Sequence, residues 1–331
     1  MEIARAVIVA TPTAQDRPWS SIGSAPKPLV PIATRPILFH TLDALRSAGV
    51  LEAALLTEPH TADCFRAAVG DGERFGMSIS YEQCEGETDV CGALRVAGDF
   101  VDGEPVLVQR ADAILRDDLR EHIVGFARED LDALALMLLR ARTPEPLPRL
   151  AGGYLLSPAA ISIMLGDGPV SRDPLARLRR HGSHVRELDV EGCLACHGGE
   201  ASLLEANRHA LTSIRTAVDG VSLEGCEIQG SVIIHPTAVL QNTLVRGPAI
   251  IGPDCRLVDS YVGPYTSVGR GVRIEGTEIE HSIVMDDARL LFVGSRLETS
   301  IIGRGAGVVR RFDMPSAARM SIGDGAQVAL S

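Results

Sequence analysis

Residues 234–285 repeat with a period of 17 residues, and this repeat restricts the possible folds more than any other feature of the sequence. Each period carries three aliphatic positions, spaced six, five and six residues apart. The equivalent residues are Ile234, Ile251 and Val268; Leu240, Leu257 and Ile274; and Val245, Val262 and Ile279. Small residues such as Gly252 and Gly269 recur between them. The pattern predicts three short strands per turn, separated by tight corners.

Strands this short are not stable alone in water, but stacked coils pair their backbones and bury the inward aliphatic rows. The fixed register therefore predicts a triangular prism of roughly five parallel coils, from near Gly220 to near Val309. A β-sandwich is the alternative, but its strand spacing should vary along the chain. The spacing resembles that of hexapeptide-repeat proteins, and the resemblance implies a left-handed parallel β-helix.

The N-terminal half shows strands that alternate with amphipathic helices, which predicts an α/β domain with a mixed, mainly parallel sheet covered on both faces. Strands are expected at residues 3–10, 51–57, 77–83, 106–109 and 133–139, and helices at 37–48, 61–69, 90–96 and 117–126. The predicted domains span residues 1–218 and 219–331. Ligands of such sheets bind beyond the carboxyl ends of the strands, so residues 11–28 and those after Gln109 are the places expected for a site.

Composition excludes several classes of function. The 331 residues are 45% hydrophobic, which is enough for two cores, and a net charge of −11 argues against a nucleic-acid partner. No apolar run is long enough for a membrane span or a secretory signal, so we expect a cytoplasmic protein without a membrane partner. The seven cysteines lack framework spacing, which predicts reduced thiols.

Lys27 is the only lysine among the 32 basic residues of the chain. A chain that uses arginine elsewhere would be expected to carry arginine at this position too. A single surface lysine without a function is one interpretation, and a position that requires a compact ammonium group is the other. The sequence around Lys27 favours the second.

Four segments carry a resemblance to a known family. Residues 26–38 (PKPLVPIATRPIL) resemble the segment that follows the first loop of sugar nucleotidyltransferases. Residues 259–269 (DSYVGPYTSVG) and 278–285 (EIEHSIVM) closely resemble the β-helix of long-form glucose-1-phosphate thymidylyltransferases, and residues 203–208 (LLEANR) resemble the helix that joins their two domains. The resemblance covers nearly the whole chain. It implies a nucleotidyltransferase-like (Rossmann-like) α/β domain followed by the β-helix.

The family joins a nucleoside triphosphate to a sugar 1-phosphate and releases pyrophosphate, so cations and amide donors must offset repulsion between phosphates. The resemblance places Lys27 and Arg17 at the phosphate-binding, catalytic positions. It places Ala10 and Thr11 at the start of the nucleotide-binding loop. The family has paired glycines where this chain has Thr11 and Pro12, and proline has no N–H to offer a phosphate.

The magnesium ligands expected from the resemblance are only partly present. Asp112, in the sequence RADA, matches the first carboxylate, whereas Cys196 stands where the family has a second aspartate. Because Mg²⁺ prefers oxygen ligands, a weak magnesium site is expected.

The base and sugar pockets also differ from the family pattern. Gln83 resembles the glutamine that contacts the nucleotide base, and Asp89 stands where a glycine would let the base approach the backbone. The segment between residues 139 and 154 is shortened and lacks the family's sugar-phosphate motif. Arg140 or Arg142 is a candidate replacement for a missing lysine charge.

Three functional hypotheses remain open at this point. The first is a nucleotidyltransferase that uses nucleoside triphosphate, sugar phosphate and Mg²⁺. The second is a catalytically silent relative that binds a ligand or a protein partner, because the glycine loop, the second carboxylate and the sugar-binding segment all depart from the family. The third is an acyltransferase that uses His235 or His281 on the β-helix, which would need a coenzyme A groove and more coils. The CLACH sequence at residues 193–197 fits covalent haem attachment, but no export signal accompanies it. A homo-oligomer is expected, since coil ends and flat faces commonly become interfaces.

Overall fold

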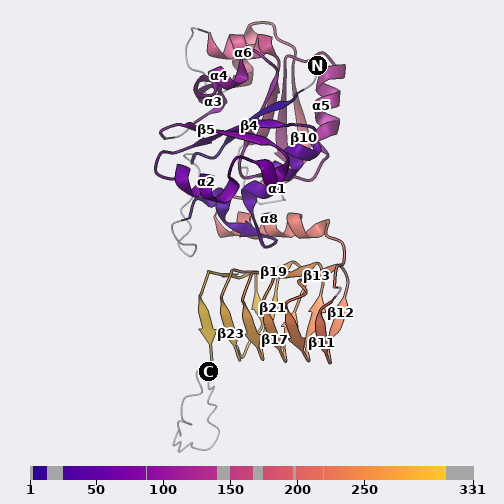
Figure 1. The fold of residues 1–331 in the computed structure, drawn as a ribbon. Coiled ribbons are helices and arrows are strands. Elements are labelled where there is room, and N and C mark those ends of the chain that lie inside the picture. The colour runs from indigo at the N-terminus through magenta and orange to yellow at the C-terminus, as the bar shows by residue number, and fades with distance from the viewer. Residues whose placement is uncertain are drawn as a thin grey trace, which may run out of the picture.

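A computed structural model describes residues 3–12, 25–86, 88–139, 150–166, 174–196, 199–218 and 220–310, which form an α/β domain followed by a β-helix (Figure 1). The α/β domain is built on one mixed sheet of eight strands. In spatial order these are β5 (Ser78–Gln83), β4 (Glu52–Thr57), β1 (Arg5–Val9), β6 (Val106–Arg110), β9 (Ala151–Leu156), β8 (Ala133–Leu139), β10 (Val185–Leu194) and β7 (Ala113–Leu115). Strands β5, β4, β1 and β6 are mutually parallel, whereas β9 runs antiparallel between β6 and β8. The predicted fold class is confirmed.

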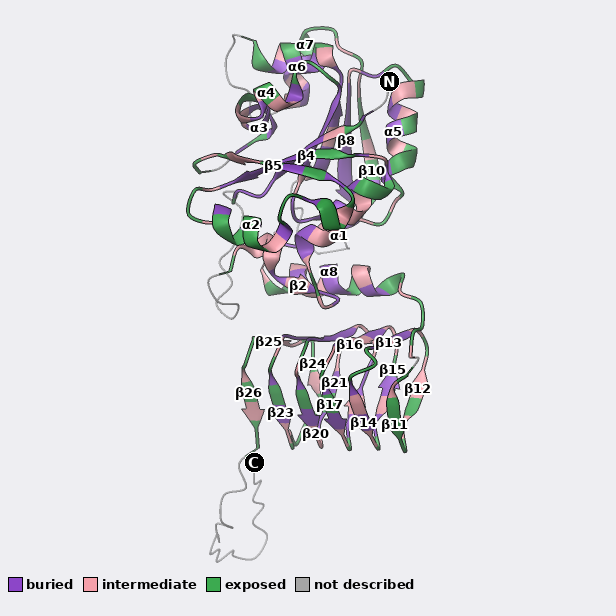
Figure 2. Cartoon of the chain, in the orientation of Figure 1, coloured by how far each residue is buried: buried purple, intermediate pink, exposed green. Residues whose placement is uncertain are grey.

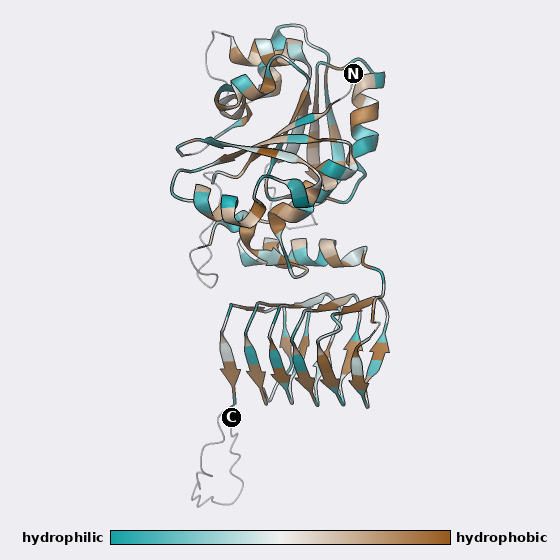
Figure 3. Ribbon diagram, in the orientation of Figure 1, coloured by the Kyte–Doolittle hydropathy of each residue, from teal (hydrophilic) through white to brown (hydrophobic). Residues whose placement is uncertain are grey.

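Helices cover both faces of this sheet, as the alternation of strands and helices predicts. One face packs against α1 (Ile37–Ser47), α2 (Ala62–Val69) and α5 (Leu119–Arg128), and the other against α3 (Val90–Val96), α4 (Gly98–Val101), α6 (Pro158–Leu165) and α7 (Pro174–Arg180). Strand β1 supplies both cores, because successive side chains point to opposite faces: Ala6 and Ile8 join one cluster, Val7 and Val9 the other. The central strands are accordingly almost wholly buried, and α5 carries alternating hydrophobic and hydrophilic bands (Figures 2 and 3).

Short elements connect β1 to the first long helix. After the loop that follows β1 come the 3-10 helix η1 (Lys27–Leu29) and the two-stranded hairpin of β2 (Pro31–Ile32) and β3 (Arg35–Pro36). A second 3-10 helix, η2 (Glu73–Phe75), precedes β5. Helix α8 (Glu200–Thr212) ends the α/β domain and lies between the sheet and the β-helix (Figure 1).

The C-terminal repeat folds into a left-handed parallel β-helix with three sheets, one for each side of the prism. The first contains β11 (Ser222–Glu224), β14 (Val239–Gln241), β17 (Arg256–Val258), β20 (Arg273–Glu275), β23 (Arg289–Leu291) and β26 (Gly307–Val309). The second contains β12 (Glu227–Gln229), β15 (Leu244–Arg246), β18 (Tyr261–Val262), β21 (Glu278–Glu280) and β24 (Leu297–Glu298). The third contains β13 (Val232–Ile234), β16 (Ala249–Ile251), β19 (Thr266–Val268), β22 (Ile283–Val284) and β25 (Ile301–Ile302). The inward aliphatic residues predicted from the repeat form one buried core.

The register of the coils is 17 residues at first and changes near the C-terminal end. Leu240 pairs with Leu257 and Leu257 with Ile274, but Val268 pairs with Val284, 16 residues on. The cause is the corner between β21 and β22, which has two residues where the corner between β18 and β19 has three. The corner between β23 and β24 is longer, so Ile279 pairs with a residue 18 positions on. Corner length thus varies while the inward rows stay aligned.

The α/β domain and the β-helix share an apolar cluster around α8. It contains Val30, Ile32, Ile37, Ile114, Ala195, Cys196, Leu203, Ala206, Ile283 and Met285. Asn207, which is 1% exposed, connects three segments at its centre. Its Oδ1 accepts hydrogen bonds from the Ala33 backbone N–H and the Ser267 hydroxyl, both at 2.8 Å, and its Nδ2 donates to the Tyr265 carbonyl at 3.1 Å. The β2–β3 hairpin is therefore held against the β-helix.

Among the described residues, no helix is both long and apolar enough to cross a membrane.

Candidate functional site

A cavity of about 290 Å³ lies at the carboxyl ends of β1, β4 and β6, the edge where parallel sheets bind ligands. It is lined by Val9, Ala10, Thr11, Pro12, Ala25, Pro26, Lys27, Pro28, Glu58, His60, Thr61, Cys64, Arg110 and Asp112. Four of the residues predicted from the sequence, Ala10, Thr11, Lys27 and Asp112, therefore lie around one cavity. They come from segments up to about a hundred residues apart in the sequence, which the parallel strands bring together.

Lys27 begins η1, whose backbone is fixed by its neighbours. Pro26 and Pro28 flank Lys27 and restrict the backbone, and the Lys27 carbonyl accepts a hydrogen bond from the Val30 N–H at 3.0 Å. The side chain is half-buried. Val30 in turn belongs to the apolar cluster at the β-helix, so the position of Lys27 depends on the junction between the domains.

The segment after β1 provides a hydroxyl where the family resemblance would have glycine. Thr11 is 4% exposed, and its Oγ1 has no hydrogen-bond partner within the described part of the chain. The Ala10 N–H is already bonded to the Leu56 carbonyl at 2.9 Å and is therefore committed to the sheet. A buried hydroxyl without a partner is costly, so a group that could hydrogen-bond to Thr11 would be stabilised in this cavity.

Asp112 is 2% exposed and is held by two groups. The Arg110 Nε donates to Oδ1 at 2.9 Å, and the Cys196 backbone N–H donates to Oδ2 at 3.1 Å. Burial alone would raise the pKa of Asp112, but the adjacent Arg110 guanidinium and these hydrogen bonds hold that pKa below its ordinary value. The carboxylate is thus charged, with an arginine as its counter-ion.

The position of Cys196 confirms neither a second carboxylate nor a thiol ligand. Its backbone lies against Asp112, but the residue is 2% exposed and belongs to the apolar cluster shared with the β-helix. Among the described residues, no group of three or more His, Cys, Asp and Glu side chains could hold a metal ion. The donor set around Asp112 therefore does not fit Mg²⁺, which requires near-octahedral oxygen ligands.

The other predicted residues lie elsewhere or outside the described residues. Gln83 ends β5, and neither it nor Asp89 lines the cavity. Asp89 caps α3, since its side chain accepts a hydrogen bond from the Gly92 N–H at 2.7 Å. Arg17 falls in residues 13–24, and Arg140 and Arg142 fall in residues 140–149; both segments lie outside the described part of the chain.

Several lining residues were not predicted. Glu58, His60 and Cys64 follow β4 directly, and Arg110 is the last residue of β6. The signal was present in the sequence, because the strand expected at 51–57 runs parallel to β1 and ends at the same edge. His60 Nε2 lies 3.7 Å from a Glu58 carboxylate oxygen. The cavity thus combines cationic and anionic side chains.

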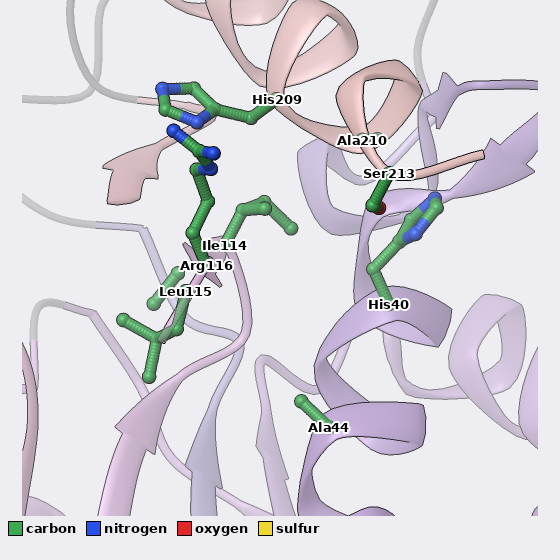
Figure 4. A pocket seen from close by; sticks show the side chains of 9 residues that line it. His40, Ala44, Ile114, Leu115, Arg116, His209, Ala210 and Ser213 are labelled. Atoms are coloured by element: carbon green, nitrogen blue, oxygen red, sulfur yellow. The ribbon is translucent and has the colours of Figure 1, made fainter. Parts of the chain in front are cut away.

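A second cavity, of about 280 Å³, lies between α1, β7 and α8 (Figure 4). His40, Arg116, His209 and Ser213 provide its polar lining. His40 Nε2 is 3.2 Å from the Ile32 carbonyl, and burial lowers the pKa of this imidazole. Burial also lowers the pKa of His209, although Glu205 lies 3.0 Å away and acts in the opposite sense.

Comparisons with known proteins agree with this geometry. A family model described as nucleotidyl transferase matches residues 22–146. A glucose-1-phosphate thymidylyltransferase from Streptomyces griseus is 30% identical over 334 residues, which cover 92% of this chain and 94% of that protein. The low-salt glycan biosynthesis nucleotidyltransferase Agl11 of Haloferax volcanii is 27% identical, with 95% and 96% covered. A solved structure of a putative glucose-1-phosphate thymidylyltransferase from Bacillus anthracis aligns with a TM-score of 0.54 and 20% identity, covering 65% of this chain and 97% of that one.

Proposed function

The chain belongs to the sugar-1-phosphate nucleotidyltransferase family, and on that premise we propose that it transfers a nucleotidyl group from a nucleoside triphosphate to a sugar 1-phosphate. The observation that carries the proposal is the convergence of Lys27, Thr11 and Arg110 on one cavity at the carboxyl ends of the parallel strands. This arrangement offers cations and a hydroxyl to a phosphate chain. The relatives named as glucose-1-phosphate thymidylyltransferases favour a thymidine nucleotide and a glucose phosphate as the first pair to test.

In the proposed reaction, an oxygen of the sugar phosphate forms a bond to the α-phosphorus of the triphosphate. The bond from that phosphorus to the pyrophosphate oxygen breaks, and pyrophosphate leaves with the electron pair. Attack of one anion on another requires positive charge close to both. Lys27 supplies an ammonium group at the cavity wall, and we propose that Arg17 contributes a second cation from the loop after β1. Ala10 and Thr11 form the floor near the phosphates, and Gln83 and Asp89 lie toward the base in this proposal.

When bound, Mg²⁺ would neutralise phosphate charge in such a reaction. Asp112 is the candidate ligand, but it is already paired with Arg110, and the Cys196 position contributes a backbone N–H instead of a carboxylate. No step of the proposed reaction is therefore assigned to the metal.

A catalytically silent, ligand-binding protein is the second candidate, and one observation favours it. The thiol at position 196 is buried in the apolar cluster, so the site lacks the second carboxylate of the family pattern. Such a protein would bind a nucleotide through Lys27 without releasing pyrophosphate.

The test is a turnover assay with each nucleoside triphosphate against a panel of sugar 1-phosphates, in which sugar nucleotide and pyrophosphate are measured by chromatography. We expect turnover with at least one pair. Lys27→Ala should lower kcat/KM by about 100-fold, and Lys27→Arg should restore it only in part, because a guanidinium does not have the shape of an ammonium. Nucleotide binding by calorimetry without turnover for any pair would support the silent candidate instead. Equal affinity in the wild type and Lys27→Ala would reject the assignment of Lys27.

We also propose that the chain forms a homo-oligomer through the β-helix. The coil ends present unpaired backbone groups, and Phe292 and Val309 near the last coil are about half exposed (48% and 52%). Light scattering across micromolar concentrations should give a mass of at least twice 35.2 kDa. A monomer mass at every concentration would exclude this proposal.

A further inference from the structure

Arg110 lies where a bound cation would be useful for phosphate chemistry. It ends β6 and is paired in register with Val9, the last residue of β1, so it stands beside the loop that follows β1. The Ala111 N–H bonds to the Val9 carbonyl at 2.9 Å and fixes this placement. The Arg110 side chain is 20% exposed and lines the cavity that also contains Lys27 and Thr11.

We propose that the Arg110 guanidinium takes the place of the divalent metal in this cavity, so that the phosphate chain of a nucleotide binds without a metal ion. The inference rests on the proposed function, since it concerns the same cavity and the same class of ligand. It goes further in naming the cation that faces the phosphates.

The first argument is the state of Asp112. A metal ion would have to displace Arg110 from a carboxylate oxygen 2.9 Å away, in a site where the carboxylate is 2% exposed. It would gain no second carboxylate, because the Cys196 backbone N–H occupies the other Asp112 oxygen at 3.1 Å. Mg²⁺ gives up its water ligands reluctantly and needs several oxygens in return. Arginine as the permanent counter-ion of Asp112 is the better fit.

The second argument is the chemistry of the guanidinium. It carries five N–H donors in a plane and remains charged at all physiological pH values. The contact with Asp112 uses Nε, on one edge of that plane. A guanidinium can bind a carboxylate with one edge and phosphate oxygens with another, which an ammonium or a metal with a filled shell cannot do in the same way.

The two interpretations of Asp112 predict opposite effects of Asp112→Asn. If Asp112 holds a metal, the variant loses ligand affinity. If Asp112 is the counter-ion of Arg110, the variant removes a negative charge beside the ligand and leaves the guanidinium in place, so anion affinity rises. The asparagine keeps the shape of the side chain and an oxygen for the Cys196 N–H, which limits any effect on folding.

The experiment is calorimetry with inorganic pyrophosphate in EDTA. We expect the wild type to bind, Asp112→Asn to bind about threefold or more tightly, and Arg110→Leu to bind about tenfold or more weakly. Because Arg110→Leu leaves a buried carboxylate without a counter-ion, the neutral pair Arg110→Gln/Asp112→Asn is made as well and should also bind weakly. The matched control is Arg116→Leu, which removes the same charge from an exposed ion pair with Glu191 at the other cavity and should leave affinity unchanged.

A second measurement uses Mn²⁺ alone, detected by electron paramagnetic resonance. We expect no Mn²⁺ binding in this cavity of the wild type, and binding to appear in Arg110→Leu/Cys196→Asp, which replaces the arginine and supplies a second carboxylate. Stoichiometric Mn²⁺ binding by the wild type that is lost in Asp112→Asn would overturn the inference.

The outcomes separate this inference from the proposed function. Turnover and pyrophosphate binding that both require Mg²⁺ would overturn the inference and leave the proposed function intact. Pyrophosphate binding in EDTA that depends on Arg110, with no turnover for any substrate pair, would support the inference and reject transfer activity. The absence of nucleotide and pyrophosphate binding in either buffer would reject both.

Discussion

In the β-helix each coil repeats the surroundings of the one before it, so Leu240, Leu257 and Ile274 occupy nearly the same environment and are all fully buried. In the cavity of the α/β domain no two lining residues have equivalent surroundings, and each depends on a particular partner from a distant segment. The β-helix can therefore absorb a corner that is one residue shorter or longer without losing its inward rows. The cavity has no such tolerance, because the role of Asp112 changes when one neighbour becomes arginine and another becomes cysteine.

The comparison teaches where the effect of a substitution should be local and where it should be conditional. In a stack of repeats, the energy of a position depends on whether a coil lies above and below it. In the cavity, it depends on the charge and the hydrogen-bonding capacity of one or two specific groups.

The largest expected effect is on the β-helix core. Leu257→Ala removes a fully buried side chain and should lower the free energy of unfolding by about 3 kcal/mol, measured by urea denaturation. Leu223→Ala is the matched control, because it is the same substitution at the equivalent position of the first coil, where the side chain is 39% exposed. Its cost should stay below about 1 kcal/mol. Similar costs at both positions would contradict the idea that neighbouring coils provide the stability.

The next effect concerns the junction of the two regions. Asn207→Ala leaves the Ala33 N–H and the Tyr265 carbonyl without their partner and should cost about 2 kcal/mol. Ser267→Ala removes only one hydrogen bond to Asn207 and should cost about 1 kcal/mol. Differential scanning calorimetry checks both variants. A single unfolding transition in the wild type that splits in Asn207→Ala would show that this side chain couples the α/β domain to the β-helix, and an unchanged profile would show that it does not.

A smaller effect is expected from pH, and it is confined to the junction side of the α/β domain. Burial lowers the pKa of His40 in the folded protein below its ordinary value of 6.5, while Arg35 lowers it further and Asp43 acts in the opposite sense. The unfolded chain then binds more protons than the folded one as the pH falls below about 6.5, so stability decreases on acidification and is fully present above that pH.

The measurement compares urea unfolding at about pH 7.5 and pH 5.5 for the wild type and His40→Gln. Glutamine keeps a donor for the Ile32 carbonyl but cannot titrate. We expect the loss of stability on acidification to be smaller in the variant. Identical losses would assign the pH dependence to other groups.

The smallest effect on stability is expected at the cavity. Thr11→Val removes a buried hydroxyl without a partner among the described residues, and should raise the free energy of unfolding by up to about 1 kcal/mol. Pyrophosphate affinity should fall about threefold if the hydroxyl serves the ligand. Thr57→Val is the control, since Thr57 also has a buried hydroxyl without a partner in the described part of the chain but does not line the cavity. If both variants leave affinity unchanged, Thr11 has no role in binding.

The two regions also differ in how far their sequences predict them. The 17-residue period is a local property, and it predicts the three sheets and the inward rows of the β-helix; only the 16- and 18-residue registers escape it, because corner lengths carry no strong signal. In the α/β domain, helix α3 and strand β8 have the bounds that were expected, whereas β9 and β10 were not anticipated. Strand β9 inserts antiparallel between two strands, a pairing decided by the whole sheet.

The cavity was predicted only as far as the family resemblance reached. Lys27, Thr11 and Asp112 lie around it as expected, but nothing in the sequence RADA indicates that the first residue of the four pairs with the third. That contact depends on the Cys196 backbone, which arrives from a segment 84 residues away. The role of Asp89 as a helix cap, in contrast, is a local signal that the sequence contains, since aspartate directly before the helix expected at 90–96 is a common N-cap.

The bond network of Asn207 makes the chain a poor candidate for division into fragments. A protein ending near residue 218 would lose the Tyr265 and Ser267 partners and would open Ile32, Cys196 and Leu203 to water. The turn at Ala33 and Thr34, where both residues have positive φ values of 45° and 65°, would keep only half of its present support. Because Lys27 lies on the same short stretch, exchange of this β-helix for one from another protein would be expected to change the nucleotide site as well as the shape of the assembly.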